Sequence, residues 1–169
     1  MDKHQQEVIK AWIAAGLWLG LIAFESTDLL SAHHTASFLY AVLKYVFGPV
    51  DLVKFAYWHA IARKAGHIVG YGILSVLLFR AWQVTLPFSW MPRWSWRWAQ
   101  LSVYGTVLVA SLDEWHQSYI PSRTGTWHDV ALDGSAGITA QILLYFLVRG
   151  WRREASSSTA ESAAMAAEK

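Results

Sequence analysis

Residues 111–137 read S-L-D-E-W-H-Q-S-Y-I-P-S-R-T-G-T-W-H-D-V-A-L-D-G-S-A-G and lie between two apolar runs, 98–112 and 130–148. Each run has the composition of a membrane helix. The stretch between them concentrates polar and charged side chains, which belong to Asp113, Glu114, His116, Gln117, Arg123, His128, Asp129 and Asp133. Because this cluster falls where two expected membrane helices end, we take it as the centre of a candidate site and ask what else in the chain points to it.

The composition of the chain is typical of an integral membrane protein. Of its 169 residues 54% are hydrophobic and 15% are charged, whereas soluble domains carry about 25% charged residues. The length predicts one domain. A net charge of +2 and the lack of a Lys/Arg tract argue against nucleic acid as a partner. The absence of cysteine excludes disulfides, thiolate zinc sites and thiol nucleophiles.

The apolar runs predict an all-α fold, an integral membrane bundle with four transmembrane helices at about 8–27, 62–82, 98–115 and 128–149. The first run is interpreted as an uncleaved span rather than a signal peptide, because residues 24–28 offer no small-residue cleavage site. Residues 1–153 are assigned to the transmembrane domain. Residues 154–169 are rich in Ala, Ser, Thr and Glu without apolar periodicity, and this composition predicts a disordered tail.

The segment between the first two predicted spans is ambiguous. An apolar stripe over 38–47 ends at Gly48-Pro49, and a second apolar stretch covers 50–61. Lys44, Asp51 and Lys54 would each be costly near the middle of a membrane. We therefore expect one or two interfacial helices within 35–61. The alternative is a single poor transmembrane segment, which would invert every later helix.

Basic residues favour one orientation. With four spans, the N-terminus, the loop at 83–97 and the C-terminus share a side whose basic residues outnumber those of the other, so the chain is predicted to be a multi-pass inner-membrane protein with cytoplasmic N- and C-termini. The basic residues of the inner side are Lys3, Lys10, Arg80, Arg93, Arg97, Arg149, Arg152 and Arg153.

This topology brings the polar helix ends together at the outer face. Lys64, His67 and Tyr71 are spaced i, i+3, i+7 along one helix face. Gly134 and Gly137 in the last span would allow a close helix approach. The candidate site comprises Lys64, His67, Tyr71, Asp113, Glu114, Gln117, Arg123, Asp129 and Asp133, with Glu25, Ser26 and His128 as further lining.

Several motifs resemble the VanZ-like family of small bacterial membrane proteins. They are K-A-G-H-I-V-G-Y at 64–71, D-E-W-H-Q at 113–117 and P-S-R-T-G-T-W-H-D at 121–129, followed by Gly134 and Gly137. The resemblance extends from about residue 12 to residue 147. It implies a multi-pass membrane protein linked, through the namesake of the family, to low-level resistance to glycopeptides (teicoplanin).

Two further positions bear on the resemblance. Phe24-Glu25-Ser26 fits the end of the first helix in that family. Asp133 departs from it, since the family usually has Asn there, and this departure adds one acid to the cluster.

The favoured function is the binding of a head group at the outer leaflet. Arg123, Lys64 and His67 are donors suited to phosphate or carboxylate. The acids would hold these bases in place or recruit a divalent cation such as magnesium or calcium; no resident cofactor or metal is otherwise expected. The expected partners are the lipid bilayer and the head group of a polyprenyl phosphate or a peptidoglycan precursor.

Three alternatives stay open at this stage. The protein could be a lipid-phosphate hydrolase or transferase in which His67 or His128 acts as nucleophile or general acid/base. The cluster could be a structural network in which Asp113 or Glu114 pairs with Arg123 and Lys64. The chain could also be a small interaction or transport protein. The sequence favours binding over catalysis and predicts no oligomeric state.

Overall fold

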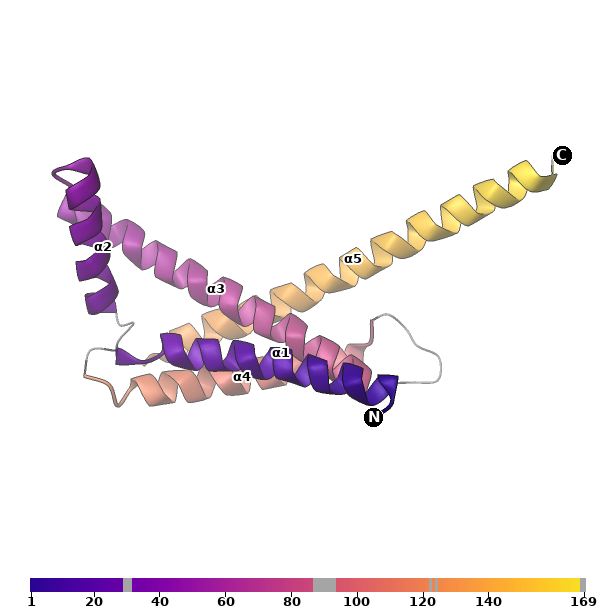
Figure 1. Cartoon of the computed structure of the whole chain (residues 1–169), viewed down its shortest axis with the longest axis horizontal. Helices are drawn as coiled ribbons and strands as arrows, with labels where there is room; N and C mark the ends of the chain where they lie inside the picture. The colour runs from indigo at the N-terminus through magenta and orange to yellow at the C-terminus, as the bar shows by residue number, and fades with distance from the viewer. Residues whose placement is uncertain (29–31, 87–93, 122, 124, 168–169) are drawn as a thin grey trace.

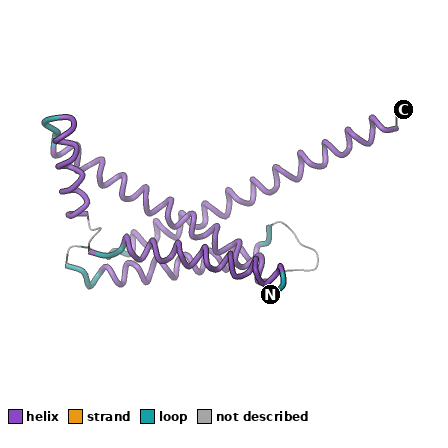
Figure 2. The backbone as a smooth tube through the Cα atoms, viewed as in Figure 1, coloured by secondary structure: helices purple, strands orange, loops and turns teal. Residues whose placement is uncertain are grey.

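The computed structural model describes residues 1–28, 32–86, 94–121, 123 and 125–167, and within these ranges the side chains of 32–34 and 150–167 are left aside. Its described elements are all helices: α1 (Lys3–Glu25), α2 (Ala32–Phe47), α3 (Leu52–Thr85), α4 (Trp96–Gln117) and α5 (Trp127–Ala167). The predicted all-α fold is therefore confirmed. Figure 2 shows that helix makes up nearly all of the described backbone.

Three helices are long and apolar enough to cross a membrane, namely α1, α3 and the part of α5 up to Arg149. The helix α4 has 22 residues, or about 33 Å at 1.5 Å per residue, and it packs on both α3 and α5. It does not meet the same standard of hydropathy, so its role as a fourth span stays a prediction. In Figure 1, α1 and α4 run in one direction while α3 and α5 return in the other.

The segment between the first two spans differs from the expectation in one respect. The helix α2 ends at Phe47, before Gly48, whose φ of +82° suits a residue without a Cβ. The stretch 52–61, however, is not a separate interfacial helix but the start of α3. Asp51 caps it by accepting hydrogen bonds from the backbone N–H groups of Val53 and Lys54, at 2.9 and 3.2 Å.

The resulting α3 has 34 residues, so it is about 51 Å long and exceeds the ~30 Å hydrocarbon core of a bilayer. Figure 1 shows its first turns projecting from the bundle together with α2, which packs against them. These two helices therefore form an arm at one end of the bundle.

The helix α5 also runs further than expected. Its backbone is helical through Ala167, over residues for which the sequence predicted a disordered tail. Ala and Glu are strong helix formers, which accounts for helix here in the absence of an apolar stripe. The division of the chain at residue 153 stays a prediction.

The bundle interior is built from small residues and aromatic rings. Near the end of α1, Ile22, Tyr71, Leu74 and Ala110 form one buried cluster. A second cluster at the opposite end contains Phe79, Trp98 and Ala99. Large apolar side chains such as Leu17 and Phe146 stay exposed, as expected for surfaces that face lipid rather than water.

Glycines set the closeness of α4 and α5. A Cβ on Gly137 would lie 3.0 Å from Thr106 Cγ2, and one on Gly134 would lie 3.1 Å from Val107 Cγ2. The predicted close approach at these two glycines is therefore confirmed. It holds the first turns of α5, which carry Asp129 and Asp133, against α4.

Candidate functional site

A cavity of about 660 Å³ opens where α3, the end of α4 and the start of α5 meet α2. Seven of the nine predicted site residues line it: Lys64, His67, Glu114, Gln117, Arg123, Asp129 and Asp133. The volume falls within the range of ligand sites, about 300–1,000 Å³. We call this space the polar cavity.

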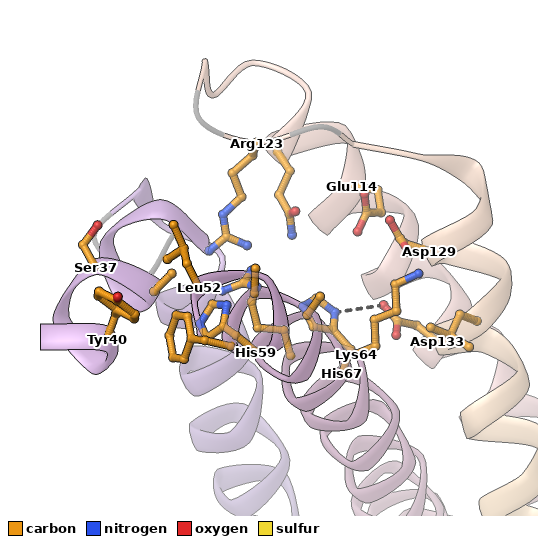
Figure 3. Close-up of a pocket in the computed structure, with 17 residues that line it drawn as sticks. Ser37, Tyr40, Leu52, His59, Lys64, His67, Glu114, Arg123, Asp129 and Asp133 are labelled. Atoms are coloured by element: carbon orange, nitrogen blue, oxygen red, sulfur yellow. Dashed lines mark hydrogen bonds and ion pairs between the residues drawn. The ribbon is translucent and has the colours of Figure 1, made fainter. Parts of the chain in front are cut away.

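Basic and acidic side chains lie on opposite sides of the cavity. Figure 3 shows Arg123 reaching in from the loop before α5, on the side of His59 and the α2 helix. Glu114, Asp129 and Asp133 lie on the opposite side. A ligand that carries negative charge would therefore be drawn to the basic side and held off the acidic one.

His67 and Asp133 form the central polar contact. His67 Nδ1 lies 3.4 Å from Asp133 Oδ2. The Asp133 side chain is almost wholly buried, whereas the His67 side chain keeps 29% of its surface exposed. Asp133 Oδ1 is buried and has no hydrogen-bond partner, which makes Asp133 a costly residue to hold in this place.

Tyr71 and Asp113 lie behind the cavity rather than in it. The Tyr71 hydroxyl donates to Asp113 Oδ2 at 2.8 Å, and both residues line a small neighbouring pocket with His67, Glu25 and Ser26. Tyr71 is 1% exposed. The pair therefore joins α3 to α4 beneath His67.

Glu114 and Asp129 shape the start of α5. Glu114 Oε2 accepts from the backbone N–H of Thr126 at 2.8 Å, and the Thr126 hydroxyl donates to Asp129 Oδ2 at 2.8 Å. The loop must pass very close to α4, because a Cβ on Gly125 would lie 2.1 Å from the Glu114 carbonyl oxygen. These two acids therefore hold the entry of α5 in place.

Arg123 and Gln117 reach the end of α1. The guanidinium of Arg123 donates to the carbonyl oxygens of Glu25 and Thr27. Gln117 Nε2 donates to Ser26 Oγ at 3.2 Å. Arg123 thus satisfies carbonyls that a helix end leaves without partners, a positional role that the sequence did not predict.

The remaining predicted residues lie at the margin. Lys64 is exposed at the rim, and no described carboxylate forms an ion pair with it. His128 is exposed, its ring contacts that of Trp127 at a tilt, with centroids 3.6 Å apart, and it is not among the residues that line the cavity. Ser26 is buried and Glu25 is exposed.

Sequence reasoning missed part of the lining. His59 and Arg63 precede His67 by eight and four residues on α3, so the three share one helix face. Tyr40 and Phe55 add aromatic wall, and their rings lie 5.3 Å apart. The Gly48-Pro49-Val50-Asp51 sequence, which ends one helix and caps the next, was the signal that could have placed His59 on the same helix as Arg63 and His67.

Arg63 lies close enough to Arg123 and Glu25 for their charges to act on it. Two guanidinium groups beside one cavity repel each other, and a bound anion would relieve that repulsion. Among the described side chains, no group of three or more His, Asp or Glu is arranged to hold a metal ion, so the geometry does not support the divalent cation considered for the acidic cluster.

Comparison with known proteins gives one match. A family model described as VanZ/LLP1 matches residues 11–149. No curated protein and no solved structure matches the chain. The matched region contains every residue that lines the polar cavity, the last three predicted spans and all but the first residues of the first. This chain, with its membrane-length helices and its polar cavity at one end of the bundle, therefore belongs to the VanZ/LLP1 family.

Proposed function

We propose that this protein binds the anionic head group of a lipid, a polyprenyl phosphate or a lipid-linked peptidoglycan precursor, in the polar cavity at the outer leaflet. In this role it would contribute to glycopeptide (teicoplanin) resistance. This function requires that the protein lies in the inner membrane with both termini in the cytoplasm, the orientation that the distribution of basic residues favours.

One observation carries the proposal: the cavity combines Arg63, Lys64 and Arg123 with an apolar wall from α2 and the start of α3. Arginine binds phosphate bidentately, and its charge survives at any physiological pH. The apolar wall, which includes Leu52 and Phe55, suits the first carbons of a lipid chain. A soluble anion would gain nothing from it, so the lining favours an amphipathic ligand.

Arg63 is a better test residue than Arg123. Arg123 also holds the end of α1 through two backbone carbonyls, so its removal would change folding and binding together. Arg63 lies one helical turn from His67 on the face that lines the cavity. Its replacement therefore tests the basic side of the cavity directly, away from the two carbonyls that Arg123 holds.

The experiment measures binding of a short polyprenyl phosphate to the purified protein in nanodiscs, by the change in tryptophan fluorescence. Arg63→Gln should weaken binding about tenfold or more, because a charge-assisted hydrogen bond contributes about 1.5–3 kcal/mol. Arg80→Gln is the matched control, since Arg80 lies on the same helix at the opposite end of the bundle, bonded to Gln83. Equal affinity in wild type and Arg63→Gln would overturn the proposal.

The cellular arm uses the same two variants. Cells that express Arg63→Gln should lose protection against teicoplanin at unchanged protein abundance, and cells that express Arg80→Gln should keep it. If cells that express Arg63→Gln stay protected, teicoplanin resistance does not depend on ligand binding in the polar cavity.

A further inference from the structure

The contact between His67 and Asp133 orients one histidine nitrogen toward the cavity. Because Nδ1 faces Asp133 Oδ2 at 3.4 Å, the other ring nitrogen, Nε2, points away from that buried carboxylate. No described residue pairs with Nε2, and the side chain keeps 29% of its surface exposed. Figure 3 shows the His67 ring between Asp133 on one side and the open space below Arg123 on the other.

This arrangement is that of an activated histidine. A carboxylate on one ring nitrogen fixes the tautomer, so that the other nitrogen carries the lone pair. It also stabilises the positive charge that the ring acquires when that lone pair forms a bond. Tyr71, bonded to Asp113, stacks beside the His67 ring with centroids 6.2 Å apart and limits its rotation.

Basic groups lie where the opposite charge would develop. Arg63 is one turn from His67 on the same face of α3, and Arg123 reaches into the same cavity. In phosphoryl transfer, negative charge spreads over the non-bridging oxygens of the phosphoryl group. Guanidinium groups beside that position stabilise the transition state more than the ground state.

We propose that the polar cavity is the active site of a lipid-phosphate monoester hydrolase in which His67 Nε2 is the nucleophile and Asp133 is its positioning residue. This inference rests on the head-group binding proposed above. The substrate class is a long-chain alcohol or diacylglycerol esterified to a terminal phosphate.

The reaction balances in two steps. His67 Nε2 donates its lone pair to phosphorus, the bond between phosphorus and the lipid oxygen breaks, and the lipid alkoxide takes a proton from cavity water. The hydroxide left from that water then attacks phosphorus, the nitrogen–phosphorus bond breaks, and inorganic phosphate leaves. The sum is one phosphate monoester and one water converted to one alcohol and one phosphate, with no oxidation or reduction.

The lining also explains why the substrate would be a lipid. Figure 3 shows Tyr40 and Leu52 on the side of the cavity away from Asp133, and the ring of Phe55, which also lines the cavity, lies 5.3 Å from that of Tyr40. A leaving alcohol on that side would lie against α2, whose outward face carries exposed apolar side chains such as Phe38 and Val42. A chain that leaves the cavity this way would pass from protein to lipid without crossing water.

The test measures phosphate release from three probes by the purified protein in detergent micelles: geranylgeranyl monophosphate, dioleoyl phosphatidic acid and glycerol 3-phosphate. Release from the first or second probe, with glycerol 3-phosphate inert, is the expected result. Whichever lipid is preferred identifies an isoprenoid or a glycerolipid source.

His67→Asn should lower release at least 100-fold while the affinity for the lipid phosphate stays within about twofold of wild type. His128→Asn is the matched control, because His128 is exposed outside the cavity, and it should keep full activity. Asp133→Asn should lower kcat with little change in KM. With radiolabelled phosphate, wild type should carry an acid-labile, base-stable label that His67→Asn lacks.

Failure of this inference differs from failure of the binding proposal. Lipid phosphate that binds with Arg63 dependence but is never hydrolysed overturns the hydrolase and leaves the binding function standing. Lipid phosphate that does not bind overturns both. Release that is unchanged in His67→Asn overturns the assignment of the nucleophile.

Discussion

Burial of Asp133 lowers the stability of the fold, because its surroundings satisfy only one of its two carboxylate oxygens. One of its carboxylate oxygens contacts His67, and the other is buried without a partner. An unsatisfied buried polar atom costs about 1–3 kcal/mol. A residue that lowers stability in this way, at the wall of a cavity, is expected where function rather than folding selects it.

Asp133→Asn should raise the free energy of unfolding by about 1 kcal/mol, since the amide removes a buried charge yet still offers an oxygen to His67 Nδ1. Thermal unfolding in detergent, followed by circular dichroism, measures the change. Asp129→Asn serves as the comparison, because Asp129 is only partly buried and its carboxylate accepts from Thr126, so it should not become more stable. A lower free energy of unfolding for Asp133→Asn would mean that the contact with His67 stabilises the fold by more than the burial of the carboxylate destabilises it.

At the scale of the helices, the end of α1 is tied to the loop before α5 by long-range contacts. Arg123 holds the carbonyls of Glu25 and Thr27, and Gln117 holds Ser26. These residues are separated by about ninety positions in the chain, so the contacts close a long loop. They also fix one wall of the polar cavity, because Arg123 itself lines it.

Arg123→Ala should lower the free energy of unfolding by about 1–3 kcal/mol, because two backbone carbonyls lose a charged donor. Arg149→Ala is the control at the other end of the bundle: Arg149 is exposed and bonds its own neighbour Tyr145, so its loss should change stability by less than about 0.5 kcal/mol. Denaturant titration in detergent compares the two. Equal stability of both variants would show that the tie to α1 contributes nothing.

Periodicity predicted the half of the site that lies on regular helices. Because the four-helix topology brings these helix ends together, His67, Glu114, Gln117, Asp129 and Asp133 were expected to lie near one another, and all five line the cavity. His59 was missed because α3 was taken to begin at residue 62, although Asp51 carries a capping signal. Arg63 lay within the predicted span but was not included in the predicted site.

The tie from Arg123 to α1 could not be predicted in the same way. It depends on where an irregular loop passes, and no periodic pattern in the sequence encodes that path. For the same reason Gly125 stood out only in the structure, where its missing side chain lets the loop pass the Glu114 carbonyl. The helices that carry the site were therefore predictable from the sequence, whereas the path of the loop before α5 was not.

For the molecule as a whole, the orientation in the membrane can be tested without altering the background sequence, because the chain has no cysteine. His4 and His116 are both exposed, His4 in the first turns of α1 and His116 in the last turn of α4. On spheroplasts, a membrane-impermeant maleimide should label His116→Cys directly. It should label His4→Cys only after permeabilisation.

The two variants control for each other, since each must be labelled fully once the membrane is opened. Labelling in the reverse order would place the polar cavity on the cytoplasmic side. The binding site would then face metabolites of the cell rather than envelope precursors, although its geometry would be unchanged.

Because α3 is one continuous helix, a small change in its tilt moves the wall of the cavity that its first turns and α2 form. Trp18 Nε1 donates to the Gly70 carbonyl and anchors α3 to α1, and the helix then continues for 18 residues, about 27 Å, to Leu52. A tilt of only one degree about that anchor moves the far end, and α2 with it, by about 0.5 Å. Because a helix longer than the local hydrocarbon thickness accommodates the mismatch partly by tilting, we expect a thinner or thicker membrane to change the width of the mouth of the cavity.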